Sequence, residues 1–142
     1  MNAGIELCKN TEMTNDEFRE FSTEWAGAWN AHDLDRILIH FSEDVTFVSP
    51  MATLLMPESG GVIRGKRMLE EYWREGLRRI PDLHFDVIAT YVGVDTLVIN
   101  YRNQKGGLVN EVLELDGHLV VRGNATYLDD PSHSGDASSD PA

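Results

Sequence analysis

The sequence predicts one α+β domain, in which a curved antiparallel sheet carries helices on its concave side, and three observations lead to this prediction. Two segments near the start and one in the middle repeat apolar residues with the period of a helix. From residue 84 onward, four runs alternate with the period of a strand. Short, turn-rich connections join these runs, so neighbouring strands should pair antiparallel. The 142 residues have the size of one domain.

The first two helices are predicted near the start of the chain. Thr14 is followed three residues later by Glu17, which is the pattern of a capping box, and we expect a helix over 14–31. One stripe of this helix is apolar: Phe18, Phe21, Trp25, Ala28 and Trp29. After a polar corner, Asp33 is placed to cap a second short helix. The apolar residues of that helix are Leu34, Ile37, Leu38 and Phe41.

The middle of the chain changes from the helical period to alternation. Residues 45–49 alternate, with Val45, Phe47 and Ser49 on one face, and Pro50 ends this strand. The stretch 51–61 is apolar but contains proline and glycine, so a loop with strand-like pieces is expected there. A short strand over 62–64 and a third helix over Lys66–Arg79 follow.

Four strands are predicted in the second half. They cover 84–92, 96–104, 108–115 and 118–127. The pair Asp116-Gly117, between two β-rich runs, is the strongest hairpin signal of the sequence. The outer face of these last strands is also partly apolar, as Val112 beside Leu113 illustrates. Because large exposed apolar patches are rare on monomers, a homodimer through this face is expected.

The ends of the chain are expected to lie outside the folded domain. Residues 1–13 are predicted to be a flexible N-terminus, and 14–128 to be the domain. Residues 129–142 are rich in Ser, Asp, Gly and Pro, with no large apolar side chain after Leu128. Such a segment buries too little surface to offset its ordering entropy, so a disordered tail is expected.

Composition argues against several classes of partner. The net charge is −12, with 24 acidic residues against 12 basic ones, so nucleic acid is not an expected partner. The densest basic cluster is Arg74, Arg78 and Arg79, and it is matched by glutamates at helical spacing. No apolar run approaches the length of a membrane span or a signal peptide core, and one cysteine permits no internal disulfide. A cytoplasmic protein is therefore expected.

No cofactor is predicted. The histidines and acids lack the spacing of a zinc or non-haem iron site, so no metal ligand is assigned. The glycine pairs lack the strand-turn-helix context of a phosphate-binding loop.

Three segments resemble a known superfamily. They are W-N-A-H-D-L-D-R-I-L-I-H-F-S-E-D-V-T-F-V-S-P at 29–50, G-V-I-R-G-K at 61–66, and D-G-H-L-V-V-R-G-N-A-T-Y at 116–127. This pattern resembles the nuclear transport factor 2-like superfamily, and most closely its ketosteroid isomerase and SnoaL-like polyketide cyclase branches. The resemblance implies a cystatin-like cone around one internal pocket. It leaves the chemistry open, because the superfamily holds isomerases, cyclases, dehydratases, hydrolases and non-catalytic binders.

Three catalytic positions of the isomerase branch can be carried over from this resemblance. The position of the general-base aspartate is Ser49 here, which cannot act as a base near neutral pH. The position of the donating tyrosine on the first helix is Trp25, and that of the protonated acid is Glu111. Ketosteroid isomerase activity itself is therefore not expected.

The strand pattern supports an independent hypothesis for Glu111. It alternates with Leu113 and Leu115 and so faces an apolar side of the sheet, where a carboxylate is unfavourable unless paired or protonated. It has either a pocket role or a structural ion pair. Arg122 and Asn124 alternate on the last strand, and we hypothesise that both face the cavity of Glu111. The alternative is a solvated stripe. If buried beside Glu111, Arg122 should keep it ionised.

The remaining candidates would form the wall of the pocket. Trp25 either donates its indole N–H to a ligand or belongs to the core, as Trp29 is expected to do. Met51 lies in an apolar loop that either closes the pocket mouth or packs in a dimer interface. The residues expected to bind substrate are Phe47, Ser49, Met51, Tyr72, Trp73 and Asn124.

These residues lead to one hypothesis and two alternatives. A small hydrophobic molecule would undergo cofactor-free acid–base chemistry of the isomerase, cyclase or dehydratase type. Glu111 would be the acid or base, Arg122 and Trp25 would hold a carbonyl or oxyanion, Asn124 would orient the substrate, and Ser49 would make a weak polar contact. The first alternative is a non-catalytic ligand binder or dimeric interaction module, which the missing base at Ser49 favours. The second is a transport or assembly adaptor.

Overall fold

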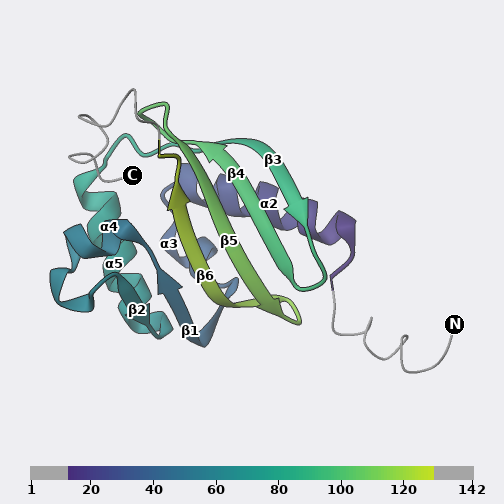
Figure 1. The fold of residues 1–142 in the computed structure, drawn as a ribbon, viewed down its shortest axis with the longest axis horizontal. Coiled ribbons are helices and arrows are strands. Elements are labelled where there is room, and N and C mark those ends of the chain that lie inside the picture. The colour runs from purple at the N-terminus through teal and green to yellow at the C-terminus, as the bar shows by residue number, and fades with distance from the viewer. Residues whose placement is uncertain (1–12, 130–142) are drawn as a thin grey trace, which may run out of the picture.

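A computed structural model describes residues 13–129, in which helices pack against one face of a curved six-stranded sheet (Figure 1). The α-helices in this range are α2 (Asn15–Asn30), α3 (Leu34–Leu38), α4 (Pro50–Leu55) and α5 (Lys66–Arg79), with a short 3₁₀ helix η1 (Pro57–Ser59). The strands are β1 (Phe41–Val48), β2 (Val62–Arg64), β3 (Asp86–Val92), β4 (Thr96–Arg102), β5 (Leu108–Asp116) and β6 (Leu119–Tyr127). The expected flexible N-terminus and disordered tail lie outside the described residues, except for Met13 and Asp129.

The predicted α+β class is confirmed, but the sheet is not antiparallel throughout. The strands lie in the order β2-β1-β6-β5-β4-β3, and β1 and β6, neighbours in the middle of Figure 1, run parallel. The other four pairs are antiparallel. A hairpin forces an antiparallel pair, whereas β1 and β6 are joined by most of the chain, so nothing local fixes their relative direction.

Helix α2 begins as the sequence predicts. Thr14 Oγ1 accepts a hydrogen bond from the Glu17 backbone N–H at 3.1 Å, and Glu17 Oε1 accepts one from the Thr14 N–H at 2.8 Å. At the next corner, the Asp33 carboxylate accepts from the Arg36 N–H at 3.2 Å and so caps α3. These two caps fix where the apolar stripe of α2 meets the sheet.

The first strand begins earlier than the alternation predicts. Phe41 was expected in the second helix, but α3 ends at Leu38 and Phe41 opens β1, where it pairs with Val120. Its ring is buried and lies 5.1 Å from that of Trp73. A residue at this spacing points inward in either conformation, so the apolar pattern does not distinguish the two.

The predicted loop 51–61 contains a helix instead. Pro50 occupies the first turn of α4, where a backbone N–H has no partner within the helix in any case. The Ser49 hydroxyl caps this helix by accepting from the Met51 N–H at 3.1 Å. The proline that ends β1 therefore also begins α4, and this places Met51 against the core.

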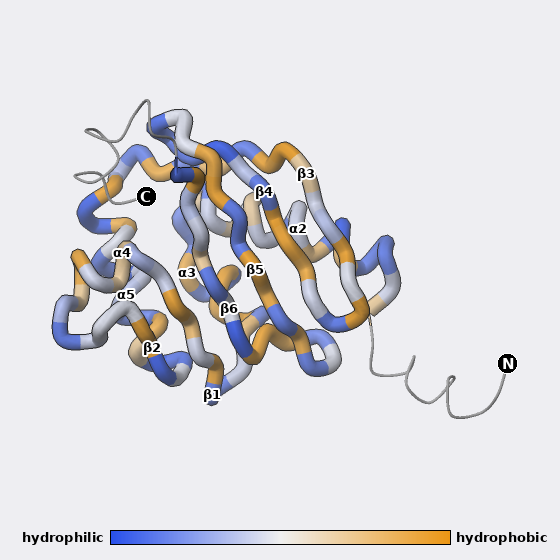
Figure 2. The backbone as a smooth tube through the Cα atoms, viewed as in Figure 1, coloured by the Kyte–Doolittle hydropathy of each residue, from blue (hydrophilic) through white to orange (hydrophobic). Residues whose placement is uncertain are grey.

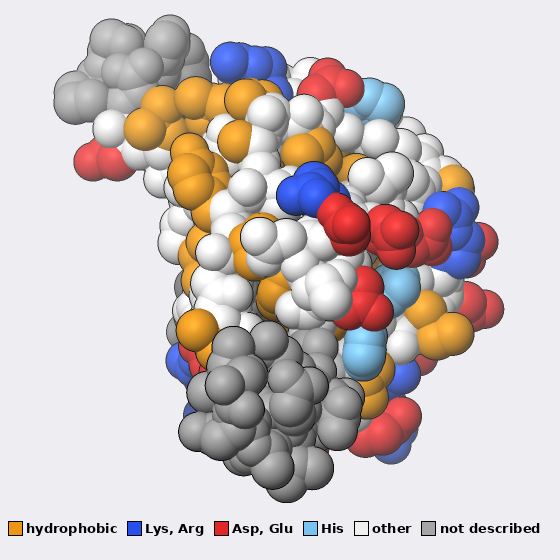
Figure 3. All heavy atoms as spheres, turned by 90° about the vertical axis from the view of Figure 1, so that its right-hand side faces the viewer, with side chains coloured by type: hydrophobic (Ala, Val, Ile, Leu, Met, Phe, Trp, Pro, Cys, Tyr) orange, Lys and Arg blue, Asp and Glu red, His pale blue; other side chains and the backbone are white. Residues whose placement is uncertain are grey.

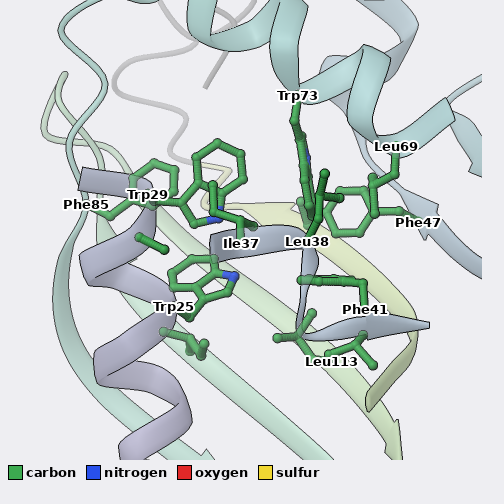
Figure 4. Close-up of a cluster of buried hydrophobic side chains, with 14 of the residues drawn as sticks. Trp25, Trp29, Ile37, Leu38, Phe41, Phe47, Leu69, Trp73, Phe85 and Leu113 are labelled. Carbon is green, nitrogen blue, oxygen red and sulfur yellow. The ribbon is translucent and has the colours of Figure 1, made fainter. Parts of the chain in front are cut away.

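The core between the helices and the sheet is largely aromatic (Figure 4). Side chains from α2, α5 and β1 converge there, and Trp29 and Trp73 meet edge to face at 5.0 Å. The Phe85 and Tyr101 rings are 4.2 Å apart. Burial alternates along β4 and β5, and the buried apolar side chains of these strands face this core. Figure 2 shows apolar stretches in both strands.

One close approach in the core depends on a glycine. At Gly123 in β6, a β-carbon would lie 2.6 Å from Phe47 Cδ1 and 3.2 Å from Leu113 Cδ2. The Phe47 ring therefore lies directly over the backbone of β6. Only glycine leaves room for it there, because real β-carbons are not found this close to a neighbouring atom.

Candidate functional site

An internal cavity of about 40 Å³ lies between the sheet, α2, α4 and α5. On the usual scale it holds roughly three water molecules. Its wall is mainly aromatic and comes from α2, β1, α5, the segment before β3, β4 and β6: Trp25, Trp29, Phe47, Tyr72, Trp73, Phe85, Tyr101 and Tyr127. Such a wall suits a flat, unsaturated or apolar group.

Glu111 is the one acidic residue of the cavity wall. Its residue surface is 7% exposed, and its Oε1 accepts a hydrogen bond from the Tyr101 hydroxyl at 2.9 Å. Burial raises the pKa of Glu111 to about 7, and the hydrogen bond from Tyr101 opposes this rise only in part. Near neutral pH, the carboxyl is therefore able both to give and to take a proton.

Three tyrosines line the same cavity as this carboxyl. Burial raises the pKa of Tyr72, Tyr101 and Tyr127 above the ordinary value, and the charge of Glu111 contributes to the rise in each. Hydrogen bonding to Ser49 opposes the rise for Tyr72 and Tyr127. All three phenols remain protonated at neutral pH and are available as hydrogen-bond donors.

The structure brings most of the predicted site residues together. Seven of the nine line the cavity: Trp25, Phe47, Ser49, Met51, Tyr72, Trp73 and Glu111. They come from α2, β1, α4 and its cap, α5 and β5, which are far apart in the sequence. Their roles in catalysis or binding remain hypotheses.

Arg122 and Asn124 do not face this cavity, so the hypothesis that they join Glu111 is wrong. Glu111 lies opposite Ala125 in the β5–β6 pair, and Ala125 is the residue of β6 that shares its side of the sheet. Arg122 lies opposite Glu114 and is exposed on the outer face.

A register shift explains this error. Counting back from the hairpin assumes regular alternation, but the β5–β6 register shifts between the pairs Glu114–Arg122 and Leu115–Val120. The extra residue in β6 turns every later side chain to the opposite face. Val120 points inward on one side of this bulge, and Arg122 points outward on the other.

The charge of the cavity also differs from the expectation. Arg122 was expected to keep Glu111 ionised, but no Lys, Arg or His is among the residues that line the cavity. Without a cation beside it, the carboxyl is subject mainly to desolvation, so its pKa rises. This favours proton transfer over a fixed negative charge.

The sequence analysis did not predict eight residues of the cavity wall: Trp29, Gly76, Ile80, Leu83, Phe85, Tyr101, Ala125 and Tyr127. Tyr101 carried a usable signal, because it alternates with the buried Leu97 and Ile99 along β4. Phe85 lies in the predicted strand 84–92, but β3 begins only at Asp86, so alternation within the strand does not fix the direction of its side chain. Tyr127 faces the cavity only because of the bulge in β6.

Other parts of the described chain provide weaker candidates for a functional site. Three arginines of α5 pair with glutamates of the same helix, as predicted: Arg74 with Glu70, and Arg78 and Arg79 with Glu75. Figure 3 shows acidic side chains gathered in a band across one face, with fewer basic ones. Within residues 13–129, no group of three His, Cys, Asp or Glu could hold a metal ion. No helix in that range is long and apolar enough to span a membrane.

The fold and the cavity define a small α+β protein built around one internal, aromatic site. The family model of the SnoaL-like domain matches residues 22–129, so the chain belongs to the SnoaL-like family. No curated protein matches the sequence.

Solved structures agree with this family. A SnoaL-like protein of unknown function from Burkholderia thailandensis is 45% identical, with a TM-score of 0.78, covering 83% of this chain and 99% of its own. An NTF2-like protein of unknown function from Cytophaga hutchinsonii is 15% identical, with a TM-score of 0.61 and coverage of 81% and 91%. A protein described as a proposed ketosteroid isomerase from Kribbella flavida is 15% identical, with a TM-score of 0.64 and coverage of 81% and 80%. The last two share the fold alone.

Proposed function

We propose that the cavity binds a small hydrophobic molecule and that Glu111 transfers a proton on it without a cofactor. The observation that carries this proposal is a buried carboxyl in the cavity wall whose pKa is about 7. A general acid or base works best when its pKa lies near the working pH. Burial brings the pKa of Glu111 close to neutral pH. A protein with the same fold is described as a proposed ketosteroid isomerase.

The proposed step uses the two oxygens of Glu111 differently. Tyr101 donates to Oε1 and fixes the orientation of the carboxyl. Within residues 13–129, Oε2 has no hydrogen-bond donor, so it is the oxygen that would take a proton from an acidic C–H of the ligand. The same proton, or one from solvent, then returns to another carbon of the conjugated system. No redox partner is required.

Donors around the carboxyl would stabilise the negative charge that develops on the ligand. The Trp25 indole and the phenols of Tyr72 and Tyr127 line the same cavity. All three are neutral donors, and such donors stabilise an enolate oxygen in a site that excludes water. Ser49 contributes a hydroxyl but no base, so Glu111 would serve as both acid and base.

Deuterium exchange into cyclopentanone tests this chemistry. We expect the wild-type protein in D₂O to catalyse exchange of the α-hydrogens of cyclopentanone for deuterium. Proton NMR measures the rate as the loss of the α-hydrogen signal. The rate should rise with pH through about 7, because the ionised Glu111 is the base. Glu111→Gln should lower it by roughly 100-fold or more. Glu114→Gln, on the outer face of the same strand, is the matched control. Equal exchange by wild type and Glu111→Gln would remove Glu111 from the chemistry.

A second candidate function is ligand binding without turnover. The cavity is small, at about 40 Å³, and Ser49 occupies the position of the isomerase base. Binding of cyclopentanone with no Glu111-dependent exchange would favour this candidate over the enzyme.

We also propose that the protein is a homodimer that buries the outer face of the sheet. Cross-strand pairing aligns one row of side chains across all six strands, and five of the six are apolar or aromatic: Val62, Val48, Asn124, Val112, Val98 and Tyr91. The row beside it is polar and contains Arg122 and Glu114. A continuous apolar row on a sheet face is suited to a second copy of the chain.

Sedimentation equilibrium tests the dimer. Wild type should sediment as a dimer, and Val112→Lys should sediment as a monomer, because the lysine places a charge at the centre of the apolar row. Ile39→Lys is the control, since Ile39 is 67% exposed and lies outside the sheet. A monomeric wild type contradicts the proposal.

A further inference from the structure

Trp29 combines two properties that its sequence position does not reveal. It is 6% exposed and lines the cavity, next to Phe85 in Figure 4 and 5.0 Å from the ring of Trp73. Its indole Nε1 is buried and, within residues 13–129, has no hydrogen-bond partner. A buried N–H without an acceptor is unfavourable by about 1–3 kcal/mol, so its retention calls for an explanation.

The location of this atom points to a ligand. Within residues 13–129, the buried His40 Nε2 also lacks a hydrogen bond, but His40 does not line the cavity. Trp29 therefore combines an unused hydrogen-bond donor with a place in the wall of the cavity. Its ring is held between Trp73 and Phe85, so the indole cannot easily turn to find an acceptor elsewhere.

We propose that Trp29 Nε1 binds a hydrogen-bond acceptor on the ligand and thereby selects its chemical class. This rests on the proposed function of the same cavity and adds the substrate class to it. The balance of hydrogen-bond donors and acceptors in the cavity wall supports an acceptor on the ligand. The indoles and phenols supply donors, whereas Glu111 is the only strong acceptor among the side chains that line the cavity. A surplus of donors suits a ligand with more acceptors than donors.

The class that fits is a small, uncharged, planar carbonyl compound. Its carbonyl oxygen accepts from the Trp29 N–H, and its unsaturated or apolar body lies among the aromatic rings. Anions are excluded, since no cation lines the cavity and ionised Glu111 would repel them. An alcohol oxygen could also accept from Trp29, but its own O–H would add a donor to a wall that already has a surplus of them.

Indole resonances report this contact directly. The chain has three tryptophans, so a ¹H–¹⁵N spectrum contains three indole N–H signals, and Trp29→Phe identifies one of them. We expect the Trp29 signal of the free protein to lie at the high-field position of an N–H without an acceptor. Added cyclopentanone should move it downfield. Methylenecyclopentane, which replaces the carbonyl oxygen by a CH₂ group, should bind without moving it downfield.

Affinity gives the second readout. Trp29→Phe should weaken cyclopentanone binding by about fivefold, the value of one neutral hydrogen bond, and should leave methylenecyclopentane binding nearly unchanged. Trp73→Phe controls for the loss of an indole ring, and in that variant the Trp29 signal should still move downfield with cyclopentanone.

Three results would overturn the inference. One is a Trp29 signal that is already downfield in the free protein, since a water molecule would then be its acceptor. Another is cyclopentanone binding that leaves the signal in place. A third is no response of any indole signal to cyclopentanone. Glu111-dependent exchange together with an unmoved Trp29 signal contradicts the role of Trp29 alone and leaves the proposed function standing.

Discussion

Glu111→Gln should raise the free energy of unfolding by about 2 kcal/mol at pH 8 and change it little at pH 4. The pKa of Glu111 is raised from 4.5 to about 7 in the folded protein. That difference corresponds to roughly 3 kcal/mol of unfavourable ionisation inside the fold. Glutamine removes the charge but leaves an amide N–H₂ to be satisfied, which offsets part of the gain.

The direction of the pH dependence follows from the raised pKa. The protonated carboxyl is compatible with the core, so its contribution to stability is complete below the unfolded pKa of 4.5. Wild type should lose stability as the pH rises from there through about 7, and should lose no more from this group above that range. Glu111→Gln should lack this slope.

Urea unfolding at several pH values measures both effects. Glu114→Gln, exposed on the outer face of β5, is the control and should keep the wild-type pH dependence. Equal stability of wild type and Glu111→Gln at pH 8 contradicts a raised pKa of the buried Glu111 carboxyl. It therefore also contradicts the acid–base role of Glu111. A gain in stability from removing a site residue is the pattern of a group retained for function.

Gly123→Ala should lower the free energy of unfolding by about 2 kcal/mol. The new β-carbon would lie 2.6 Å from Phe47 Cδ1 and 3.2 Å from Leu113 Cδ2, so the phenyl ring has to leave its place over β6. Overpacking a filled core costs about 1–3 kcal/mol. Because Phe47 lines the cavity, cyclopentanone binding should weaken as well.

Gly76→Ala is the matched control for this substitution. A β-carbon at Gly76 would meet only Leu55 Cδ1, at 3.7 Å, an ordinary contact, and alanine favours the interior of α5. The change should stabilise the protein by about 0.5–1 kcal/mol. Opposite signs for the two Gly→Ala changes in urea unfolding are the expected result.

A double variant shows whether Phe47 is the cause. Phe47→Leu removes the ring that the new methyl group meets, so Gly123→Ala should cost clearly less in that background than in wild type. Additive effects of the two changes would instead place the strain at Leu113 or in the backbone of β6.

Local signals predicted α2, α3 and α5. The capping box at Thr14, the cap at Asp33 and the span Lys66–Arg79 of α5 are confirmed, because each depends on residues within a few positions of one another. Glu111 was assigned to an apolar face by simple alternation, and it lies buried there.

Features that depend on the rest of the fold were not accessible in this way. The bulge in β6 has no local marker, and it reversed the faces expected for Arg122 and Asn124. The sequence predicts a loop after Pro50, because α4 is short and the residues that follow it include proline and glycine. The empty hydrogen-bonding position of Trp29 depends on side chains from α5 and from the segment before β3, which no pattern within α2 reveals.

The parallel pairing of β1 with β6 also governs how the protein is made. Residue 41 pairs with residue 120, so the centre of the sheet joins the early part of the chain to its last strand. A nascent chain on the ribosome carries β1 with only the three-residue β2 as a partner until β6 has emerged. During that interval the apolar side of β1 is open to other chains, and contacts this distant in sequence form slowly. The domain therefore cannot close before β6 has emerged, and a chain cut short before β6 leaves β1 without its longer partner strand.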